Sequence, residues 1–490
     1  MDAAEFRAAG HALVDQLAGV LESIASRPVT PARTPAEVRA AFRLDAPLPE
    51  HGAAAGPLLE ETARLLFEHS LFNAHPRFFD YITSSPAPIG VLADLLAAAV
   101  NSNVGSFVLS PTATEIEAQT VRWVAELIGY PTDCGGVLVS GGNMANMIGF
   151  WAARASKADW NVRTAGVAAG RSLRTYASAE THTWLQKAAD LAGLGTDSVC
   201  FIPTRDDLRM DVERLERQIV ADRASGHLPF LVVGTAGSVS TGAVDPLREI
   251  GFVCRREGLW FHVDGAYGGF AAAVDLAPAD LLAISGADSV AVDPHKWLYA
   301  PLEAGCALVR DVDALRKAFS YRPSYYNFGE NVLNYVDLGP QNSRGFRALK
   351  VWLGLRHAGA SGYRRMIADD MALAAALAEA VKAHPELEFC THELSITTYR
   401  FVPADLRGRI GEPAVDAYLD ALNREVLERV QSGGEAFVSN AVIRGRYMLR
   451  ACVVNFNTRT ADMAALVVLS ARVGRDVDTD LRPSALTASR

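Results

Sequence analysis

A lysine follows a short apolar segment in the stretch SVAVDPHKWLYAP, which covers residues 289–301. Asp293 and His295 stand just before Lys296, and an aromatic residue follows it directly. A lysine in solvent needs none of these neighbours, whereas a lysine that acts as an amine nucleophile must be shielded and its charge adjusted. We therefore expect Lys296 to take part in chemistry, and a surface lysine is the ordinary alternative.

A glycine-rich turn, SGGN at residues 140–143, lies between a predicted strand and a predicted helix. Glycine lets the backbone approach an anion closely, and the N-terminus of a helix offers free N–H groups and the positive end of its dipole. The turn is therefore a candidate phosphate site, and a plain strand-to-helix turn is the alternative. It is not a Walker loop, because the GxxxxGK[ST] spacing is absent.

A carboxylate and an imidazole complete the set of candidates. Asp264 ends the apolar segment LWFHVD, and it needs a partner because a lone buried charge is costly. That partner is either the start of the next helix or a protonated ring nitrogen. His182 precedes a predicted helix, where it either belongs to the cap or lies flat against a cofactor.

Pyridoxal 5′-phosphate (PLP) is a cofactor that uses all four features. Its phosphate occupies a glycine-rich turn, and its aldehyde forms a Schiff base with a lysine amine. Its pyridine nitrogen stays protonated beside a carboxylate, and the protonated ring then accepts electrons from the substrate. Each feature alone is weak, but the four together predict a PLP site.

These candidates fall at or near the ends of predicted strands. Short apolar segments alternate with helical stretches through the middle of the chain, which indicates an α/β fold with a mostly parallel sheet covered on both faces. Sites in such sheets lie at the carboxyl ends of the strands. The predicted strands cover residues 136–140, 230–235, 259–264 and 289–293, and a helix covers 144–155.

The two ends of the chain have a different pattern. Apolar residues at helical spacing predict helices near residues 1–25 and 57–71, and a proline-rich extended arm separates them, from Pro28 to Pro49. After residue 361 the pattern predicts a smaller α+β domain whose polar tail frays from Asp476. That domain is expected to hold helices over 364–382 and 414–430, and strands over 394–402, near 435–439 and over 447–456.

Three segments are therefore predicted along the chain. They are an N-terminal helical arm or dimerisation segment (1–87), a large PLP-binding domain (88–360) and a small C-terminal domain (361–490). An arm of this kind packs either on a partner subunit or on its own domain, and the sequence favours neither.

Composition limits the class of protein. The 490 residues are 50% hydrophobic, and a formal net charge of −9 without a long Lys/Arg run argues against nucleic-acid binding. Six scattered cysteines without a CxxC pair predict reduced thiols. No signal peptide is visible, and the longest apolar stretches carry charges and are too short to cross a bilayer. We expect a cytoplasmic protein that does not enter the membrane.

Four motifs resemble those of one family in that family's order: HPRFF at 75–79, SGGNMANM at 140–147, HVDGAYGG at 262–269 and DPHKW at 293–297. The family is the group II PLP-dependent decarboxylases of fold type I, which include aromatic-L-amino-acid, glutamate, histidine and diaminobutyrate decarboxylases. The resemblance extends from about Phe72 to Cys452. It implies decarboxylation of an L-amino acid to an amine and CO2, and a homodimer with the active site at its interface.

The resemblance also implies a role for each site residue. Lys296 would hold the cofactor covalently, Asp264 would pair with the pyridine nitrogen, and Ala266 and His182 would contact the two faces of the ring. The residues implied around the phosphate are Gly142, Asn143, Asp293 and His295.

Three positions depart from the animal aromatic decarboxylases. Asn143 replaces a serine, and Asp293 replaces an asparagine, which brings an acid close to a phosphate. Val239 replaces a threonine, so Ser238 is the alternative source of that hydroxyl. These departures affect single phosphate contacts and leave the predicted cofactor unchanged.

An irregular stretch at 320–345, rich in Tyr, Asn and Gly, predicts a lid. In the family such a loop carries a catalytic tyrosine, and counting back from RALK at 347–350 places it at Tyr335. Tyr321, Tyr325 and Tyr326 are the alternatives. Prompt protonation of the α-carbon after loss of CO2 gives an amine. If protonation is slow, the intermediate can react with oxygen to give an aldehyde, so an aldehyde synthase is the alternative activity.

The segment HPRFFDYITS at 75–84 is the one that the family uses around the substrate side chain. Its aromatic residues favour an aromatic amino acid of the tryptophan, phenylalanine, tyrosine or DOPA type. Asp80 is compatible with a cationic substrate such as diaminobutyrate, and Arg77 is compatible with an acidic substrate such as glutamate. The expected substrate contacts are His75, Phe79, Tyr81 and Ser84.

Two other classes of protein are compatible with some of these residues. A metal hydrolase would use His262, Asp264, Asp293 and His295 as ligands, but it would leave Lys296 without a role. A non-catalytic binding relative would be expected to lose Lys296 or Asp264, and both are present. We therefore expect PLP and no metal.

Overall fold

The computed structural model describes residues 1–324, 326 and 332–486. Its contacts divide the chain into two compact units. Unit 1 comprises Met1–Tyr81, Leu373–Thr391 and Thr397–Arg490, and unit 2 comprises Ile82–Ala372 and His392–Ile396. The N-terminal segment thus groups with the C-terminal residues, while the three predicted segments and their boundaries stay a prediction.

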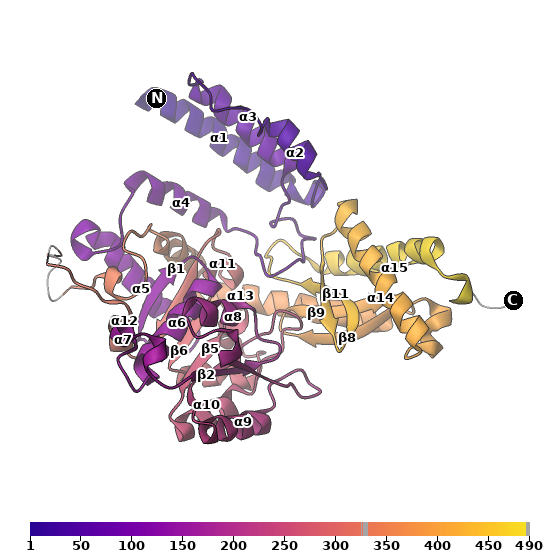
Figure 1. The fold of residues 1–490 in the computed structure, drawn as a ribbon. Coiled ribbons are helices and arrows are strands. Elements are labelled where there is room, and N and C mark those ends of the chain that lie inside the picture. Colours follow the sequence, from indigo (N-terminus) through magenta and orange to yellow (C-terminus); the bar gives the residue numbers. More distant parts are fainter. Residues whose placement is uncertain (325, 327–331, 487–490) are drawn as a thin grey trace. The chain divides into compact units, whose positions relative to one another are not determined.

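Unit 2 is built on a seven-stranded sheet with the strand order β1-β7-β6-β5-β4-β2-β3 (Figure 1). Every neighbouring pair is parallel except those of β7, which runs antiparallel to both β1 and β6. This confirms the predicted mostly parallel sheet. The strands are β1 Gly135–Val139, β2 Leu173–Ser178, β3 Val199–Ile202, β4 Leu228–Thr235, β5 Trp260–Asp264, β6 Ser289–Val292 and β7 Gly305–Val309.

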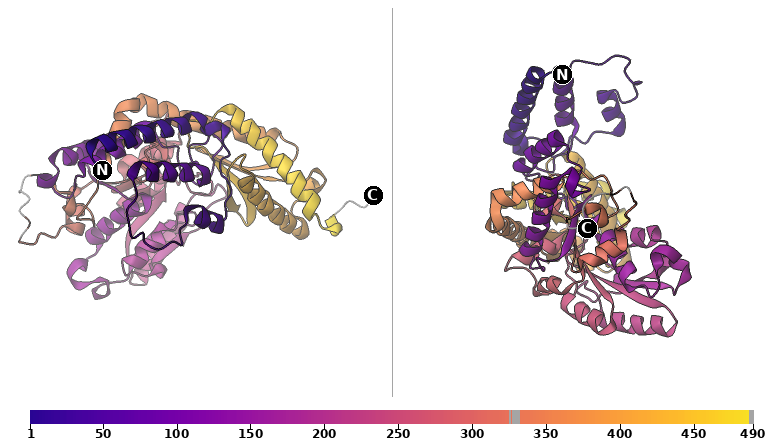
Figure 2. Two further views of the ribbon diagram at one scale, coloured as in Figure 1. Left: turned by 90° about the horizontal axis from the view of Figure 1, so that it is seen from above. Right: turned by 90° about the vertical axis from the view of Figure 1, so that its left-hand side faces the viewer.

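Helices lie on both sides of this sheet (Figures 1 and 2). The chain crosses the sheet in one direction through α6 (Gly142–Lys157) and α8 (Trp184–Leu191), and in the other through α9 (Val212–Ala224) and α10 (Leu247–Glu257). Because crossovers between parallel strands are right-handed, the two pairs of helices cover opposite faces. This double cover explains why β1, β5 and β6 are buried along their whole length.

The remaining helices of unit 2 are peripheral to these crossovers. They are α4 Pro88–Val100, α5 Pro111–Leu127, α7 Val162–Ala165, α11 Pro294–Trp297, α12 Val312–Phe319 and the first part of α13 Ala348–Ala383, with a kink at Gly359. The predicted helix over 364–382 is the second part of α13, which continues into unit 1.

Unit 1 contains a four-stranded sheet of order β10-β11-β9-β8, on which α14 packs. Its core is a single cluster of aliphatic and aromatic side chains from these strands and from the helices α14 and α15. The elements are α1 Ala3–Ser23, α2 Pro35–Phe42, α3 Ala55–His69, β8 Leu387–Glu393, β9 Ile396–Phe401, α14 Pro413–Gly433, β10 Ser439–Ile443, β11 Arg446–Cys452 and α15 Thr460–Leu481.

Two expectations for the ends of the chain are wrong. The arm between Pro28 and Pro49 is not extended throughout, because Thr34 and Glu37 form a capping box that starts α2. The tail does not fray at Asp476, because α15 continues to Leu481 and buries Val477 completely. Local composition was outweighed by a cap in the first case and by core packing in the second.

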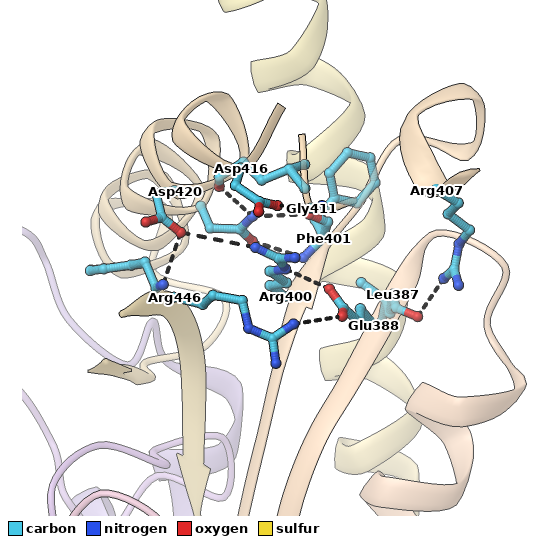
Figure 3. Close-up of polar contacts among 12 residues, drawn as sticks. Leu387, Glu388, Arg400, Phe401, Arg407, Gly411, Asp416, Asp420 and Arg446 are labelled. Atoms are coloured by element: carbon cyan, nitrogen blue, oxygen red, sulfur yellow. Dashed lines mark hydrogen bonds and ion pairs between the residues drawn. The ribbon is translucent and has the colours of Figure 1, made fainter. Parts of the chain in front are cut away.

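A buried arginine ties the elements of unit 1 together (Figure 3). Arg400 on β9 has no solvent exposure, and its Nε donates to Glu388 Oε2 of β8 over 2.5 Å. Arg446 at the start of β11 donates to the other oxygen of Glu388 over 3.2 Å, and Asp420 of α14 lies 3.9 Å from Arg400. One carboxylate thus joins three strands of this sheet through charge-assisted hydrogen bonds.

Among the described residues, no helix is both long enough and apolar enough to serve as a membrane span.

Candidate active site

The carboxyl ends of β1, β5 and β6 meet at one edge of the large sheet. These strands run in the same direction, and the register pairs Asp264 of β5 with Ala291 of β6. A cavity of about 310 Å³ opens at this edge. It is lined by eight of the predicted residues, namely Gly142, Asn143, His182, Asp264, Ala266, Asp293, His295 and Lys296.

The glycine-rich turn forms one wall of the cavity. Gly141 has φ +98°, a value that favours glycine, and α6 begins at Gly142. A β-carbon at Gly142 would lie 2.6 Å from Asp293 Oδ2, so this position has no room for a side chain. The N–H groups of the first turn of α6 lack intrahelical partners, and the turn therefore suits an anion.

Lys296 forms an ion pair with Asp293 inside the cavity. The Lys296 Nζ lies 3.0 Å from Asp293 Oδ2, and the Asp293 residue is only 1% exposed. Asp293 Oδ1 has no hydrogen-bond partner among the described residues. The lysine therefore compensates the acid whose presence near a phosphate was the main departure in the sequence.

His295 is oriented by the backbone. Its Nδ1 donates to the carbonyl oxygen of Ala304 over 2.6 Å, and its Nε2 lies 3.8 Å from Asp293 Oδ2. Burial lowers the pKa of His295 below its usual value, which favours the neutral ring at neutral pH.

Asp264 is held by two donors. Its Oδ1 accepts the N–H of Ala266 over 3.2 Å, and its Oδ2 accepts the indole N–H of Trp184 over 2.7 Å. Asp264 lines the cavity, where a carboxylate can hold a protonated ring nitrogen. The sequence analysis did not identify Trp184, and its place two residues after His182 is the signal that could have indicated it.

His182 is positioned by the same residue. Its Nδ1 accepts the backbone N–H of Trp184 over 3.2 Å, so the proton of the neutral ring resides on Nε2. Burial lowers the pKa of His182 below its usual value. A neutral, oriented imidazole in this place suits contact with a flat aromatic cofactor.

A second layer of polar residues lies behind the cavity. His262 is completely buried, with Nε2 bonded to Asn146 Oδ1 and Nδ1 to Ser289 Oγ, both over 2.7 Å. Burial lowers the pKa of His262 to about 4. Both ring nitrogens are thus occupied, and no group of three or more His, Cys, Asp and Glu in the described part of the chain could hold a metal ion. The geometry therefore gives no support to a hydrolase.

Ser238 and Val239 differ in their positions. The Ser238 hydroxyl lies 2.9 Å from that of Thr241 and is buried, whereas Val239 lines the cavity. The Ser238 hydroxyl could accept from Thr241 and still donate to a phosphate, but Ser238 is not among the described residues that line the cavity.

The predicted substrate contacts are divided between the two units. Ser84 lies in unit 2, where its hydroxyl donates to the carbonyl of His295 over 2.7 Å. His75 and Phe79 are buried in unit 1, Phe79 completely, and Tyr81 of the same unit is 66% exposed. Phe79 is packed in the core of unit 1. Of the phenylalanine and tyrosine residues at 75–84, Tyr81 alone is exposed, so its ring is accessible to a ligand.

Asp80 and Arg77 are the residues that would suit a charged substrate side chain. Both have hydrogen-bond partners within unit 1. Asp80 is buried and accepts the N–H of Tyr81 over 2.7 Å, and burial raises its pKa. The Arg77 Nε donates to Asp462 over 3.0 Å.

Tyr335 lies in the core of unit 2. It starts a short 3₁₀ turn, is 1% exposed, and stacks under the Arg344 guanidinium at 4.6 Å. Arg344 is itself fixed by a buried ion pair with Glu117. Burial raises the pKa of the Tyr335 hydroxyl well above its usual value.

The other tyrosines of the 320–345 segment have different environments. Tyr321 is 69% exposed, with Arg163 over its ring at 4.0 Å, and the Tyr326 hydroxyl accepts from Asn342 over 3.2 Å. Tyr325 lies outside the described residues.

The residues present fit PLP. A glycine turn at a helix start suits the phosphate, Lys296 supplies the amine, and Asp264 supplies the carboxylate for the pyridine nitrogen. Asp293 Oδ1 is a buried acceptor that has no donor among the described residues, which leaves it available to a further polar group.

Comparison with known proteins gives a consistent result. Residues 35–402 match the model of the pyridoxal-dependent decarboxylase conserved domain. An aromatic-L-amino-acid decarboxylase from Bacillus atrophaeus is 31% identical over 473 residues, or 96% of this chain and 95% of that one.

Two solved structures are similar over nearly their whole length. Mouse CSAD has a TM-score of 0.88 and 30% identity, and the match covers 95% of this chain and 99% of that one. Oryza sativa TDC with PLP and tryptamine has a TM-score of 0.89 and 28% identity, and the match covers 97% and 99%.

The ion pair at Lys296 leads to a test of covalent attachment. Borohydride reduction of the holoenzyme, followed by peptide mass spectrometry, is expected to find the pyridoxyl group on Lys296. Lys296→Ala should abolish turnover because, among the described residues, Lys296 is the one lysine that lines the cavity. Lys157→Ala, on the surface of α6, is the matched control. An adduct on another lysine would refute the assignment.

Proposed function

We propose that this chain, which belongs to the pyridoxal-dependent decarboxylase family and is a PLP-dependent amino acid decarboxylase, acts on an aromatic L-amino acid. The observation that carries the proposal is the cavity in which Lys296, Asp264 and the glycine turn converge, in a chain similar throughout to an aromatic-L-amino-acid decarboxylase. The predicted roles of the single site residues are part of the proposal.

PLP, when bound, supplies the electron sink for the bond to the departing carboxylate. Lys296 provides the amine that attaches the cofactor, and Asp264 holds the proton at the pyridine nitrogen. His182 limits the movement of the ring, and the turn at Gly142 and Asn143 holds the phosphate. By holding the cofactor in one orientation, these residues would also fix the position of the substrate that reacts with it.

An aromatic substrate is favoured because the two charged residues that could bind a polar substrate side chain already have partners. Arg77 and Asp80 already have partners in unit 1, so neither is a free charge for an acidic or a cationic side chain. Within unit 2, Val239 gives the cavity an apolar wall, which suits a ring. The similarity to mouse CSAD keeps an acidic substrate as the second candidate.

A homodimer is the second part of the proposal. Helix α4 exposes an apolar side in unit 2, which a soluble protein normally covers. A second copy of this chain is the partner that the family leads us to expect, with the active site at the interface. The exposed residues of α4 are Val91, Leu92, Leu95, Leu96 and Val100.

The substrate proposal is tested with a panel of L-amino acids, assayed for both amine and CO2. We expect kcat/KM for tryptophan, phenylalanine, tyrosine or DOPA to exceed that for glutamate or diaminobutyrate by about tenfold or more, because a mismatched pocket leaves polar groups unpaired. A higher kcat/KM for glutamate or diaminobutyrate would contradict the proposal. Aldehyde as the main product would indicate an aldehyde synthase.

The proton donor is tested by phenylalanine substitutions in the 320–345 segment. Tyr335 is the prediction from the count along the chain, but its burial under Arg344 makes Tyr321, Tyr325 and Tyr326 competitors. In an assay under air, we expect Tyr335→Phe to retain amine as its product. One of the other three variants should lose amine about a hundredfold and gain aldehyde, ammonia and peroxide, with dioxygen as the oxidant. Loss of amine in Tyr335→Phe alone would restore Tyr335 as the donor.

The dimer is tested by sedimentation at assay concentration. Active enzyme should sediment as a dimer, and Leu95→Glu on the exposed side of α4 should shift it toward monomer with loss of activity. Arg214→Glu, on the exposed surface of α9, is the control for adding an acidic residue. Full activity in a monomeric species would rule the proposal out.

A further inference from the structure

We propose that Trp184 is a positioning residue that holds the two polar groups next to the cofactor ring. Its indole N–H binds Asp264, and its backbone N–H binds His182. The inference rests on PLP binding, which the family establishes, and is independent of the identity of the amino acid substrate.

The contact with Asp264 is buried and short. Trp184 is 1% exposed, and its Nε1 lies 2.7 Å from Asp264 Oδ2. Asp264 Oδ1 has a longer contact, of 3.2 Å, with the Ala266 N–H. A hydrogen bond to a carboxylate is among the stronger ones in proteins, so the indole is the main protein group that fixes the rotation of Asp264. That rotation decides where the pyridine nitrogen is held.

The contact with His182 has a different origin. His182 Nδ1 accepts the backbone N–H of Trp184, which any residue other than proline would supply at this position. A change of the side chain alone therefore removes the donor to Asp264 and leaves the donor to His182. The two functions of Trp184 can be separated by experiment for this reason.

The direction of the indole is itself fixed from behind. Trp184 meets His262 edge to face, with ring centroids 5.7 Å apart and an interplanar angle of 74°. His262 is held by Asn146 and Ser289, and the Trp260 indole donates to Ser289 Oγ over 2.8 Å. A chain of buried side chains thus runs from the middle of the sheet to the carboxylate at its edge.

The test measures PLP binding by the apoenzyme and the absorption spectrum of the bound cofactor. Trp184→Phe keeps an aromatic ring and removes the N–H donor. We expect the PLP dissociation constant to rise about tenfold or more and the visible band of the bound cofactor to shift, because Asp264 loses its closest donor. Trp123→Phe is the matched control, since Trp123 stacks on Trp352 of α13 and does not line the cavity.

A double-mutant cycle with Asp264→Asn separates positioning from general packing. If Trp184 acts through the Asp264 carboxylate, Trp184→Phe should change the PLP dissociation constant far less in the Asp264→Asn background than in the wild type. An equal change in both backgrounds would overturn the proposal, as would a Trp184→Phe variant with normal PLP affinity and a normal spectrum.

Thermal unfolding of the apoenzymes checks that the variants fold. Should Trp184→Phe melt well below Trp123→Phe, Trp184→His decides the question, because histidine keeps an N–H donor in a smaller ring. PLP affinity and spectrum closer to wild type in Trp184→His than in Trp184→Phe support the inference. Equal losses in both variants contradict it.

Discussion

Two carboxylates, Asp264 and Asp293, are buried at one edge of the seven-stranded sheet, and the arrangement of the active site follows from this constraint. A buried carboxylate is tolerated only where donors or a cation compensate it. Asp264 accepts from neutral N–H donors on Ala266 and Trp184, whereas Asp293 pairs through one oxygen with the Lys296 amine. The two acids therefore have different roles. In the proposed function, Asp264 would receive the protonated ring of the cofactor, and Asp293 stands beside the amine that would attach it.

The histidines around these acids contribute shape and hydrogen bonds more than charge. Burial lowers the pKa of His182, His262 and His295, so neutral rings are favoured at neutral pH. Among the described residues that line the cavity, Lys296 is the one lysine or arginine. Its Nζ lies 3.0 Å from Asp293 Oδ2, so this chain places an acid beside the lysine where animal aromatic decarboxylases have an asparagine.

A second buried ion pair connects the site to the 320–345 segment. Arg344, just after the tyrosine-rich part of this segment, pairs with Glu117 of α5 and donates to the carbonyl of Leu138 on β1. Glu117 in turn accepts the N–H of Leu138 over 2.9 Å. The end of the segment is thereby anchored to the strand that leads into the glycine turn. Tyr335 lies under Arg344 in this anchor, and its place there separates it from the more exposed part of the segment.

The sequence by itself determined the fold class, the cofactor and eight of the residues that line the cavity. Fully buried parallel strands appear as continuous apolar runs, and polar residues directly after such runs must lie at one sheet edge, so Asp264, Asp293 and Lys296 could be brought together without coordinates. Family motifs added the reaction, because they retain the residue types that the chemistry of PLP requires.

Only the tertiary structure decided which of the remaining candidates are buried. Phe79 and Tyr335 have residue types suited to a site, but packing places both in a core, and burial depends on contacts far away in the chain. For Trp184 the reverse is true. The residues around it look like the start of an ordinary apolar helix, and its proposed role depends on the direction in which its indole N–H points, toward an acid eighty positions later in the chain. Such directions are set by the packing of elements distant in sequence, which local patterns of residue type do not encode.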